Sequence, residues 1–232
     1  MEYFVVIPAA GRGKRMKAER NKQFLLLNRV PLIVRTLQVF EQDDWCKGII
    51  VVGNRNEVNE LRQLFSEHKL SKVIDIVPGG KERQNSVYEG LKAIKGSSLA
   101  LIHDGARPFV SIESIRELVV QADQSGAAVL AVPIKDTIKQ INNHKVVKTV
   151  DRNSLWAVQT PQAFHLHNIL QAHETAEKSG YIGTDDASLI EYSGGQVSIV
   201  EGSYLNIKLT TPEDMVFANA IIHEKEGQDK DV

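Results

Sequence analysis

Short apolar runs that are typical of strands alternate along the chain with stretches that carry apolar residues at helical spacing. The strand-like runs lie near 3–7, 48–52, 73–77, 99–103 and 127–132, and helical patterns cover 32–40 and 58–65. Continuous apolar runs suit strands that are covered on both faces, and connections of this length favour parallel pairing. The pattern therefore predicts an α/β fold with a Rossmann-like, mostly parallel sheet flanked by helices.

This rhythm breaks between about 134 and 152. Alternating residues at 138–141 and 145–150 flank the polar turn Asn142-Asn143-His144, which predicts a β-hairpin. An isolated two-stranded ribbon is marginally stable at best, so we expect this arm to pack on something, most simply on the same arm of a second subunit. Further on, Thr211, Pro212 and Asp214 have the residue types of a helix start.

Composition narrows the function class. A chain of 232 residues suits one domain, 1–232, with the arm as an insertion. Lys and Arg total 28 against 29 Asp and Glu, so there is no global basic field to hold nucleic acid. A single cysteine, Cys46, excludes an internal disulfide, and no apolar run approaches the ~20 residues of a membrane span. We expect a cytoplasmic protein with neither a nucleic-acid nor a membrane partner.

The first strand runs directly into Pro8-Ala9-Ala10-Gly11-Arg12-Gly13-Lys14-Arg15-Met16, with Lys22 six residues later. Small residues let backbone N–H groups approach an anion, and Lys14, Arg15 and Lys22 bring positive charge to the same place, so the segment predicts a phosphate-binding loop. The third glycine of a dinucleotide fingerprint is replaced by Met16, and a Walker A sequence is absent. A simple strand-to-helix turn with solvated basic residues is the alternative.

Other charged motifs follow the ends of later strands. Ligands of open α/β sheets bind beyond the carboxyl ends of the strands, so Arg15, Gly80 and Asp104 are expected to converge there. His103, beside Asp104, fits a buried strand histidine better than a general base.

Seven further motifs accompany the loop, and with it they resemble the 2-C-methyl-D-erythritol 4-phosphate cytidylyltransferase family of nucleotidyltransferases, of the non-mevalonate isoprenoid pathway. They are Pro78-Gly79-Gly80-x-x-Arg83-x-x-Ser86-Val87, His103-Asp104-Gly105-Ala106-Arg107-Pro108, Lys135-Asp136-Thr137, Asp151-Arg152, Gln159-Thr160-Pro161-Gln162, Thr184-Asp185-Asp186-Ala187 and Asn206-Ile207-Lys208-x-Thr210-x-Pro212-Glu213-Asp214. The resemblance spans nearly the whole chain. It implies transfer of CMP from CTP to 2-C-methyl-D-erythritol 4-phosphate, with Mg²⁺ or another divalent cation, by an arm-exchanged homodimer.

The resemblance also implies roles for single residues. The catalytic set is Arg15, Lys22, Arg152 and Lys208, of which the first two stabilise the transition state and the last two position the acceptor phosphate. The nucleotide set is Pro8, Ala9, Ala10, Gly11, Arg12, Gly13, Lys14, Gly80 and Ser86. The acceptor pocket is formed by Asp104, Arg107, Thr137, Thr160, Thr184 and Asp185, and Asp104 also serves the metal, directly or through water.

Two alternatives stay open at this stage. A ribitol 5-phosphate cytidylyltransferase shares the loop, the metal and the dimer, although that family more often has Leu-Ala-Gly-Gly where this chain has Pro8-Ala9-Ala10. A catalytically silent nucleotide sensor would keep the glycines but would not need Arg15, Lys22, Arg152 and Lys208 together. Structural roles also remain for some of these residues, since Lys22 suits a solvated surface and Arg152 suits pairing with Asp151.

Overall fold

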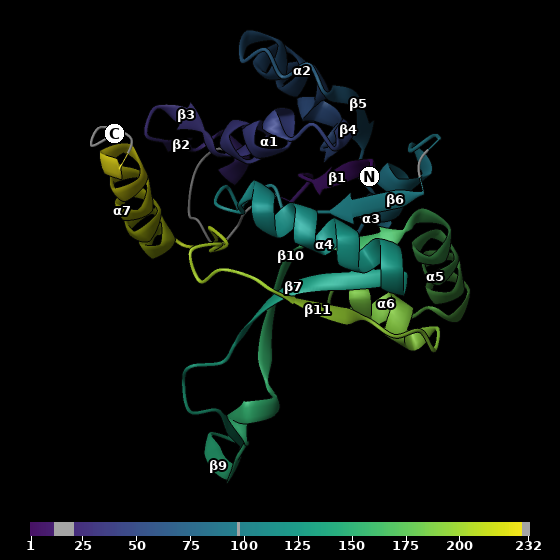
Figure 1. Ribbon diagram of the computed structural model, residues 1–232, viewed down its shortest axis with the longest axis vertical. Coiled ribbons are helices and arrows are strands. Elements are labelled where there is room, and N and C mark those ends of the chain that lie inside the picture. Colours follow the sequence, from purple (N-terminus) through teal and green to yellow (C-terminus); the bar gives the residue numbers. More distant parts are fainter. Residues whose placement is uncertain (12–20, 97, 229–232) are drawn as a thin grey trace.

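The computed structural model describes residues 1–11, 21–96 and 98–228. Within them a seven-stranded mixed sheet has the strand order β11-β7-β10-β6-β1-β4-β5 (Figure 1). Its strands are β1 (Tyr3–Pro8), β4 (Cys46–Gly53), β5 (Val73–Pro78), β6 (Leu99–Ile102), β7 (Ala127–Pro133), β10 (Trp156–His165) and β11 (Ser198–Glu201). The five strands expected from the apolar runs are β1, β4, β5, β6 and β7, so the predicted α/β fold is confirmed.

Helices cover both faces of this sheet. They are α1 (Leu32–Gln42), α2 (Val58–Glu67), α3 (Arg83–Lys92), α4 (Ile112–Ser125), α5 (Leu166–Ser179), α6 (Ala187–Tyr192) and α7 (Pro212–Gln228). Short elements are η2 (Lys22–Phe24), β2 (Leu26–Leu27), β3 (Val30–Pro31), η3 (Arg55–Glu57), β8 (Lys139–Asn142), β9 (Lys145–Thr149) and η4 (Arg152–Ser154). Among the helices of the described segments, none is both long enough and apolar enough to cross a membrane.

Strand β1 shows why the apolar runs are continuous. Val5 and Ile7 belong to the core under α1, α2 and α4, whereas Val6, between them, belongs to the core under α3, α5 and α6. Successive side chains of a strand point to opposite faces, so a strand covered by helices on both sides needs apolar residues at every position. β1 pairs in parallel with β4 and β6, which places the carboxyl ends of all three strands at one edge.

The sequence patterns did not predict β10, which runs antiparallel between β6 and β7. Its centre reads Gln159-Thr160-Pro161-Gln162, and proline with polar residues argues against a central strand. The pairing with β7 shifts register between Val158 and Gln162, which accommodates this segment. The irregular stretch matters for the site because the side chains of Gln159, Thr160 and Gln162 are buried there.

The arm is a β8–β9 hairpin, as the alternating pattern predicted. Asn143 and His144 form its turn with positive φ of 46° and 59°, which matches the two-residue turns that join twisted strands. Figure 1 shows the arm projecting away from the body of the molecule. Both of its strands are exposed, and Ile141 is 62 % accessible.

The predicted helix start at Thr211 is also confirmed. The Asp214 carboxylate accepts hydrogen bonds from the Thr210 and Thr211 N–H groups at 2.7 and 2.8 Å, which satisfies donors before the first turn of α7. Ala218, Ile221 and Ile222 bury the inner face of α7 against Ala106, Phe109 and Leu209. This contact holds the 206–211 segment near the end of β6.

Replacing Gly90 by alanine is expected to destabilise the fold. A Cβ at this position in α3 would lie 2.4 Å from Val6 Cγ1 and 2.8 Å from Val52 Cγ2. Overpacking of this kind costs about 1–3 kcal/mol, which exceeds the gain of about 1 kcal/mol in helix propensity. Urea denaturation measures the change, with Glu89→Ala on the exposed face of the same helix as control. A Gly90→Ala protein as stable as the wild type would mean that α3 moves off the sheet at no cost.

Candidate functional site

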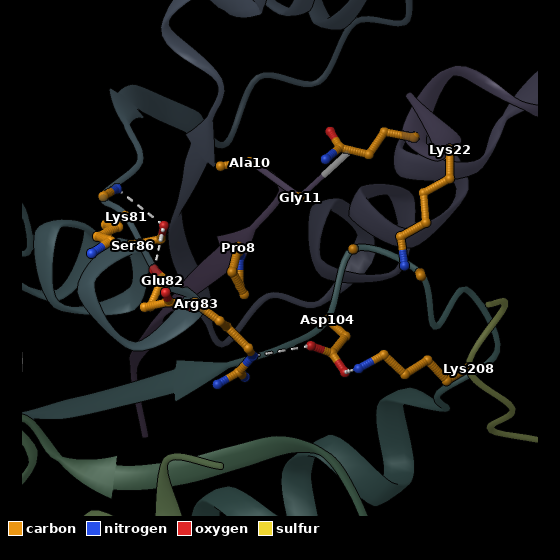
Figure 2. Close-up of a pocket in the computed structure, with 14 residues that line it drawn as sticks. Pro8, Ala10, Gly11, Lys22, Lys81, Glu82, Arg83, Ser86, Asp104 and Lys208 are labelled. Atoms are coloured by element: carbon orange, nitrogen blue, oxygen red, sulfur yellow. Dashed lines mark hydrogen bonds and ion pairs between the residues drawn. The ribbon is translucent and has the colours of Figure 1, made fainter. Parts of the chain in front are cut away.

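A pocket opens beyond the carboxyl ends of β1 and β6 (Figure 2). Its lining comes from Pro8, Ala10, Gly11, Lys22, Gln23, Gly80, Lys81, Glu82, Arg83, Ser86, Asp104, Gly105, Ala106 and Lys208. Segments from both ends of the chain therefore meet at the edge where α/β sheets bind ligands. The predicted convergence of Gly80 and Asp104 is confirmed, and Arg15 lies outside the described residues.

One wall of the pocket is the turn before α3. Ser86 Oγ accepts a hydrogen bond from the Gly80 N–H at 3.1 Å and donates one to the Glu82 carbonyl at 3.1 Å. A Cβ on Gly79 would lie 2.6 Å from Ala10 Cβ and 2.9 Å from Ser86 Oγ. Gly79 therefore lets the turn before α3 pack directly against the end of β1, and this close approach fixes the position of the turn in the pocket.

The opposite wall is built around Asp104, just after β6. Figure 2 shows Arg83 and Lys208 approaching its carboxylate from opposite sides. Lys208 Nζ lies 2.7 Å from Asp104 Oδ2, Arg83 Nε lies 3.6 Å from Oδ1, and Arg107 Nε lies 3.8 Å from Oδ2. Burial opposes ionisation, but the charges of Arg83 and Lys208 outweigh it and hold the pKa of Asp104 below its usual range.

The backbone of this wall is fixed by β10. The Asp104 N–H donates to Thr160 Oγ1 at 3.0 Å, and Asn206 Nδ2 donates to the Thr160 carbonyl at 2.9 Å. Arg107 Nη1 donates to the Asn206 carbonyl at 2.6 Å. Thr160 thus links the Asp104 and Lys208 segments from behind the pocket.

A second buried carboxylate stands behind the first. Asp186, 1 % exposed, pairs with Arg83 through Oδ2 and Nη2 at 2.8 Å. Burial raises the pKa of Asp186, and Arg83 opposes that rise. Gln162 Oε1 accepts from the Asp186 and Ala187 N–H groups at 3.2 and 3.0 Å, which pins this segment to β10.

The remaining predicted residues occupy three places. Arg12, Gly13, Lys14 and Arg15 lie outside the described residues, and Ala9 is in the core with its N–H bonded to the Val52 carbonyl.

Two residues predicted for the acceptor pocket, Thr184 and Asp185, do not line the pocket. Asp185 accepts a hydrogen bond from Gln162 Nε2 at 2.7 Å, and Thr184 is exposed beside it. Thr137 and Arg152 lie on the exposed arm, also away from the pocket. Arg152 Nη1 donates to the Lys135 carbonyl, while Asp151 accepts from the Asn153 N–H.

Sequence reasoning gave no role to Arg83, although the Gly79-Gly80 motif contains it. The signal was its position as the first residue of α3, three residues after Gly80 and three before Ser86. Its contacts with Asp104 and Asp186, residues far apart in the sequence, appear only when the chain is folded.

The pocket suits a divalent cation that is held through the Asp104 carboxylate and leaves its other ligand positions to substrate and water. Among the described residues, no three His, Cys, Asp or Glu side chains gather into a metal-binding group. Mg²⁺ commonly takes one or two carboxylates and completes its shell with substrate phosphates and water. The ionised Asp104 carboxylate fits that manner of binding, and a cage made only of protein ligands is not built from the described residues.

His103, the neighbour of Asp104, is fully buried, and its Nε2 lies 2.9 Å from the Arg107 carbonyl. Burial lowers the pKa of His103 to about 4, and it lowers the pKa of His173 to about 4 as well. This supports the structural role expected for His103, because a histidine that stays neutral at pH 7 and is sealed from solvent is a poor proton carrier.

These two histidines predict a loss of stability in acid. Histidine is protonated near pH 6.5 in the unfolded chain, but these two are protonated only near pH 4 in the folded protein. Protonation therefore favours the unfolded chain. The free energy of unfolding is highest above pH 6.5 and decreases as the pH falls toward 4. Each histidine should account for about 2 kcal/mol between pH 7 and pH 5. Denaturant unfolding at both pH values measures the difference, and His103→Gln should shrink it by about 2 kcal/mol. An unchanged difference in the variant would contradict the lowered pKa of His103.

The family comparison agrees with the geometry. Residues 3–224 match the model of the family described as 2-C-methyl-D-erythritol 4-phosphate cytidylyltransferase. A protein of that name from Halalkalibacterium halodurans is 56 % identical over 226 residues, covering 97 % of this chain and 99 % of that one. Another from Bacillus velezensis is 57 % identical over 228 residues, covering 98 % of each.

Solved structures give the same answer. A 4-diphosphocytidyl-2C-methyl-D-erythritol synthase from Anaerococcus prevotii has a TM-score of 0.84 at 31 % identity and covers 96 % of both chains. A 2-C-methyl-D-erythritol 4-phosphate cytidylyltransferase from Thermus thermophilus has a TM-score of 0.80 at 32 % identity, covering 95 % of this chain and 98 % of that one. The chain therefore belongs to the 2-C-methyl-D-erythritol 4-phosphate cytidylyltransferase family.

Proposed function

We propose that this protein transfers CMP from CTP to 2-C-methyl-D-erythritol 4-phosphate, releasing pyrophosphate and forming 4-diphosphocytidyl-2-C-methyl-D-erythritol. The observation that carries the proposal is the pocket itself, where Lys22, Ser86, Asp104 and Lys208 meet at the carboxyl ends of β1 and β6. Family membership over residues 3–224 supplies the reaction class.

The nucleotide occupies the side of the pocket formed by the end of β1 and the turn before α3. Small residues there, Pro8, Ala10 and Gly80, leave room for a pyrimidine beside backbone groups. Ser86 already uses its hydroxyl to hold the Gly80 N–H, so it acts first by shaping this wall. Lys22 enters from the opposite side, where Figure 2 shows its side chain extending into the pocket.

The reaction needs positioning and charge rather than a general base. An oxygen of the acceptor phosphate, already anionic at pH 7, attacks the α-phosphorus of CTP in line, and the bond between that phosphorus and the β-phosphate oxygen breaks. Both bonding electrons leave with pyrophosphate, and no proton has to move. Lys22 counters the charge that builds on the α-phosphate, and Lys208 holds the acceptor phosphate.

A divalent cation, as Mg²⁺, belongs to the proposal. When bound, it would supply positive charge that neutralises part of the charge on the leaving pyrophosphate. Asp104 is the pocket residue that would hold it, directly or through water. The other charged residues that line the pocket are Lys22, Lys81, Glu82, Arg83 and Lys208.

We further propose that the active unit is a homodimer in which the arm of one subunit completes the site of the other. Thr137 and Arg152 lie on the arm and do not line their own pocket. The arm exposes Ile141, Val146 and Val147, each at least 60 % accessible, and packs on little of its own chain. Apolar strands left open in this manner favour pairing with another chain.

The expected result for this function is pyrophosphate release that requires CTP, Mg²⁺ and 2-C-methyl-D-erythritol 4-phosphate together. A coupled pyrophosphate assay measures it, with ribitol 5-phosphate and an acceptor-free mixture in parallel. Lys208→Met should abolish most of the turnover, because the acceptor phosphate loses its cation. Lys47→Met is the matched control, since Lys47 is exposed and pairs with Glu2 at the amino ends of the strands.

Two outcomes would contradict the assignment. Equal turnover with ribitol 5-phosphate would move it to the ribitol 5-phosphate cytidylyltransferases. Nucleotide binding without turnover of either polyol phosphate would instead indicate a catalytically silent sensor.

A further inference from the structure

Four charged groups of alternating sign form a chain that runs from the protein interior into the pocket. Asp186 is 1 % exposed and lies 2.8 Å from Arg83 Nη2 through Oδ2. Arg83 Nε then lies 3.6 Å from Asp104 Oδ1, and Asp104 Oδ2 lies 2.7 Å from Lys208 Nζ. Lys208 and Asp104 have proposed roles in the transfer, whereas Arg83 and Asp186 have none.

We infer that Arg83 and Asp186 are positioning residues, in which Asp186 fixes the Arg83 guanidinium and Arg83 fixes the Asp104 carboxylate opposite Lys208. The inference rests on the proposed function for what Asp104 and Lys208 do. It adds how their geometry is held before substrates arrive, by Arg83 at the pocket lining and by Asp186 buried behind it.

The buried end of the chain explains why Arg83 is held. A carboxylate taken out of water is destabilising unless it is paired and hydrogen-bonded. Arg83 pairs with the Asp186 carboxylate, and His173 Nε2 lies 4.0 Å from its Oδ1, while Asp104 and Asp185 add negative charge nearby. Burial and the Arg83 charge lower the pKa of His173 to about 4, so at neutral pH the imidazole carries no charge. Arg83 therefore supplies the positive charge that Asp186 requires.

The geometry also explains the choice of arginine. One planar guanidinium presents Nη2 to Asp186 and Nε to Asp104 at the same time, which the single ammonium of a lysine does not do. Arg83 is the first residue of α3, and the Glu82–Asn85 capping box fixes that helix start, so the side chain begins from a rigid position.

This arrangement has a consequence during the reaction. Lys208 is bound to Asp104 in this structure, and it must turn toward the acceptor phosphate in the transfer. Arg83 stays with Asp104 as that happens, so the buried carboxylate keeps a counter-charge throughout. Without Arg83, Asp104 would keep only the more distant Arg107, at 3.8 Å, beside Lys208. Lys208 would then be held on Asp104 and withheld from the acceptor.

The test is a double-mutant cycle with separate binding and turnover measurements. Arg83→Met is expected to lower kcat about 10- to 100-fold, as loss of an orienting partner typically does, while CTP affinity measured without divalent cation changes less than about threefold. Arg83→Lys should recover part of the loss. Asp186→Asn should lower kcat alone but add nothing in the Arg83→Met background, because it acts through Arg83. Arg62→Met, on the exposed face of α2, is the matched control.

Full additivity of the two substitutions would overturn the inference, and so would parallel losses of kcat, CTP affinity and thermal stability, which indicate a structural role only. Crystal structures of the variants decide the matter independently of turnover. Arg83→Met and Asp186→Asn should both displace the Asp104 carboxylate and Lys208, and unmoved Asp104 and Lys208 would refute the inference. A wild-type enzyme that turns over no polyol phosphate would defeat the proposed function alone, and these structures would still judge the inference.

Discussion

Replacing Lys22 by alanine is expected to reduce kcat by about 10²- to 10³-fold, the usual cost of removing one electrostatic contact to a transition state. Lys22 lines the pocket from η2, opposite Gly80 in the turn before α3 and Ser86 in the first part of that helix. From that side its charge can act on the α-phosphate, which carries more negative charge in the transition state than in bound CTP. Arg15→Ala should behave in the same way, because the family resemblance gives both residues this role.

Comparing kcat with CTP affinity tests that role. Calorimetric binding of CTP to the Lys22→Ala protein should weaken far less than kcat falls. If affinity dropped by the same factor while kcat stayed intact, Lys22 would be a ground-state binder. Lys47→Ala, at the opposite end of β4, controls for the loss of one positive charge.

Mixing two inactive variants is expected to restore about a quarter of wild-type activity, provided that the arm works in the neighbouring subunit. Arg152→Ala and Lys22→Ala should each be nearly inactive alone. In a mixed dimer, one site combines an intact Lys22 with an intact Arg152, and the other site inherits both defects. Random subunit exchange makes about half of the dimers mixed, and each mixed dimer has one intact site out of two. About a quarter of all sites are therefore intact.

A matched pair separates this effect from nonspecific rescue. Lys22 and Lys208 line the same pocket of one chain, so co-expressed Lys22→Ala and Lys208→Ala should restore nothing. Co-expressed Arg152→Ala and Lys22→Ala with activity no higher than the parental average, after subunit exchange is verified, would mean that Arg152 serves its own chain or that the arm does not cross.

The hydrophobic pattern was sufficient to predict the strands that are covered on both faces, because such strands need apolar residues at every position. Val5, Val6 and Ile7 show this directly, since neighbouring residues fill opposite cores. β10 was missed because its buried centre is polar. Gln162 bonds to the 185–187 segment and Thr160 to the Asp104 backbone, so those side chains satisfy tertiary contacts that leave no trace in a local pattern.

Some residues of the candidate site could likewise be predicted from the sequence, and others could not. Pro8, Ala10, Gly80, Asp104 and Lys208 were found because their motifs follow strand ends or match the family, and the structure gathers them in one pocket. The link between Asp104 and Asp186 through Arg83 was not found, because nothing in the spacing of these residues says that they touch. The roles of Thr137 and Arg152 stay predictions, because they depend on a second chain.

Phosphorus NMR of the complete reaction tests the central claim most directly. With CTP, Mg²⁺ and 2-C-methyl-D-erythritol 4-phosphate, the account predicts that pyrophosphate appears together with two mutually coupled phosphorus signals, from a diphosphate that joins the cytidine α-phosphorus to the acceptor phosphate. The acceptor monophosphate signal should disappear at the same rate. Pyrophosphate accompanied by free CMP, with the acceptor monophosphate unchanged, would show hydrolysis instead of transfer and would contradict the account.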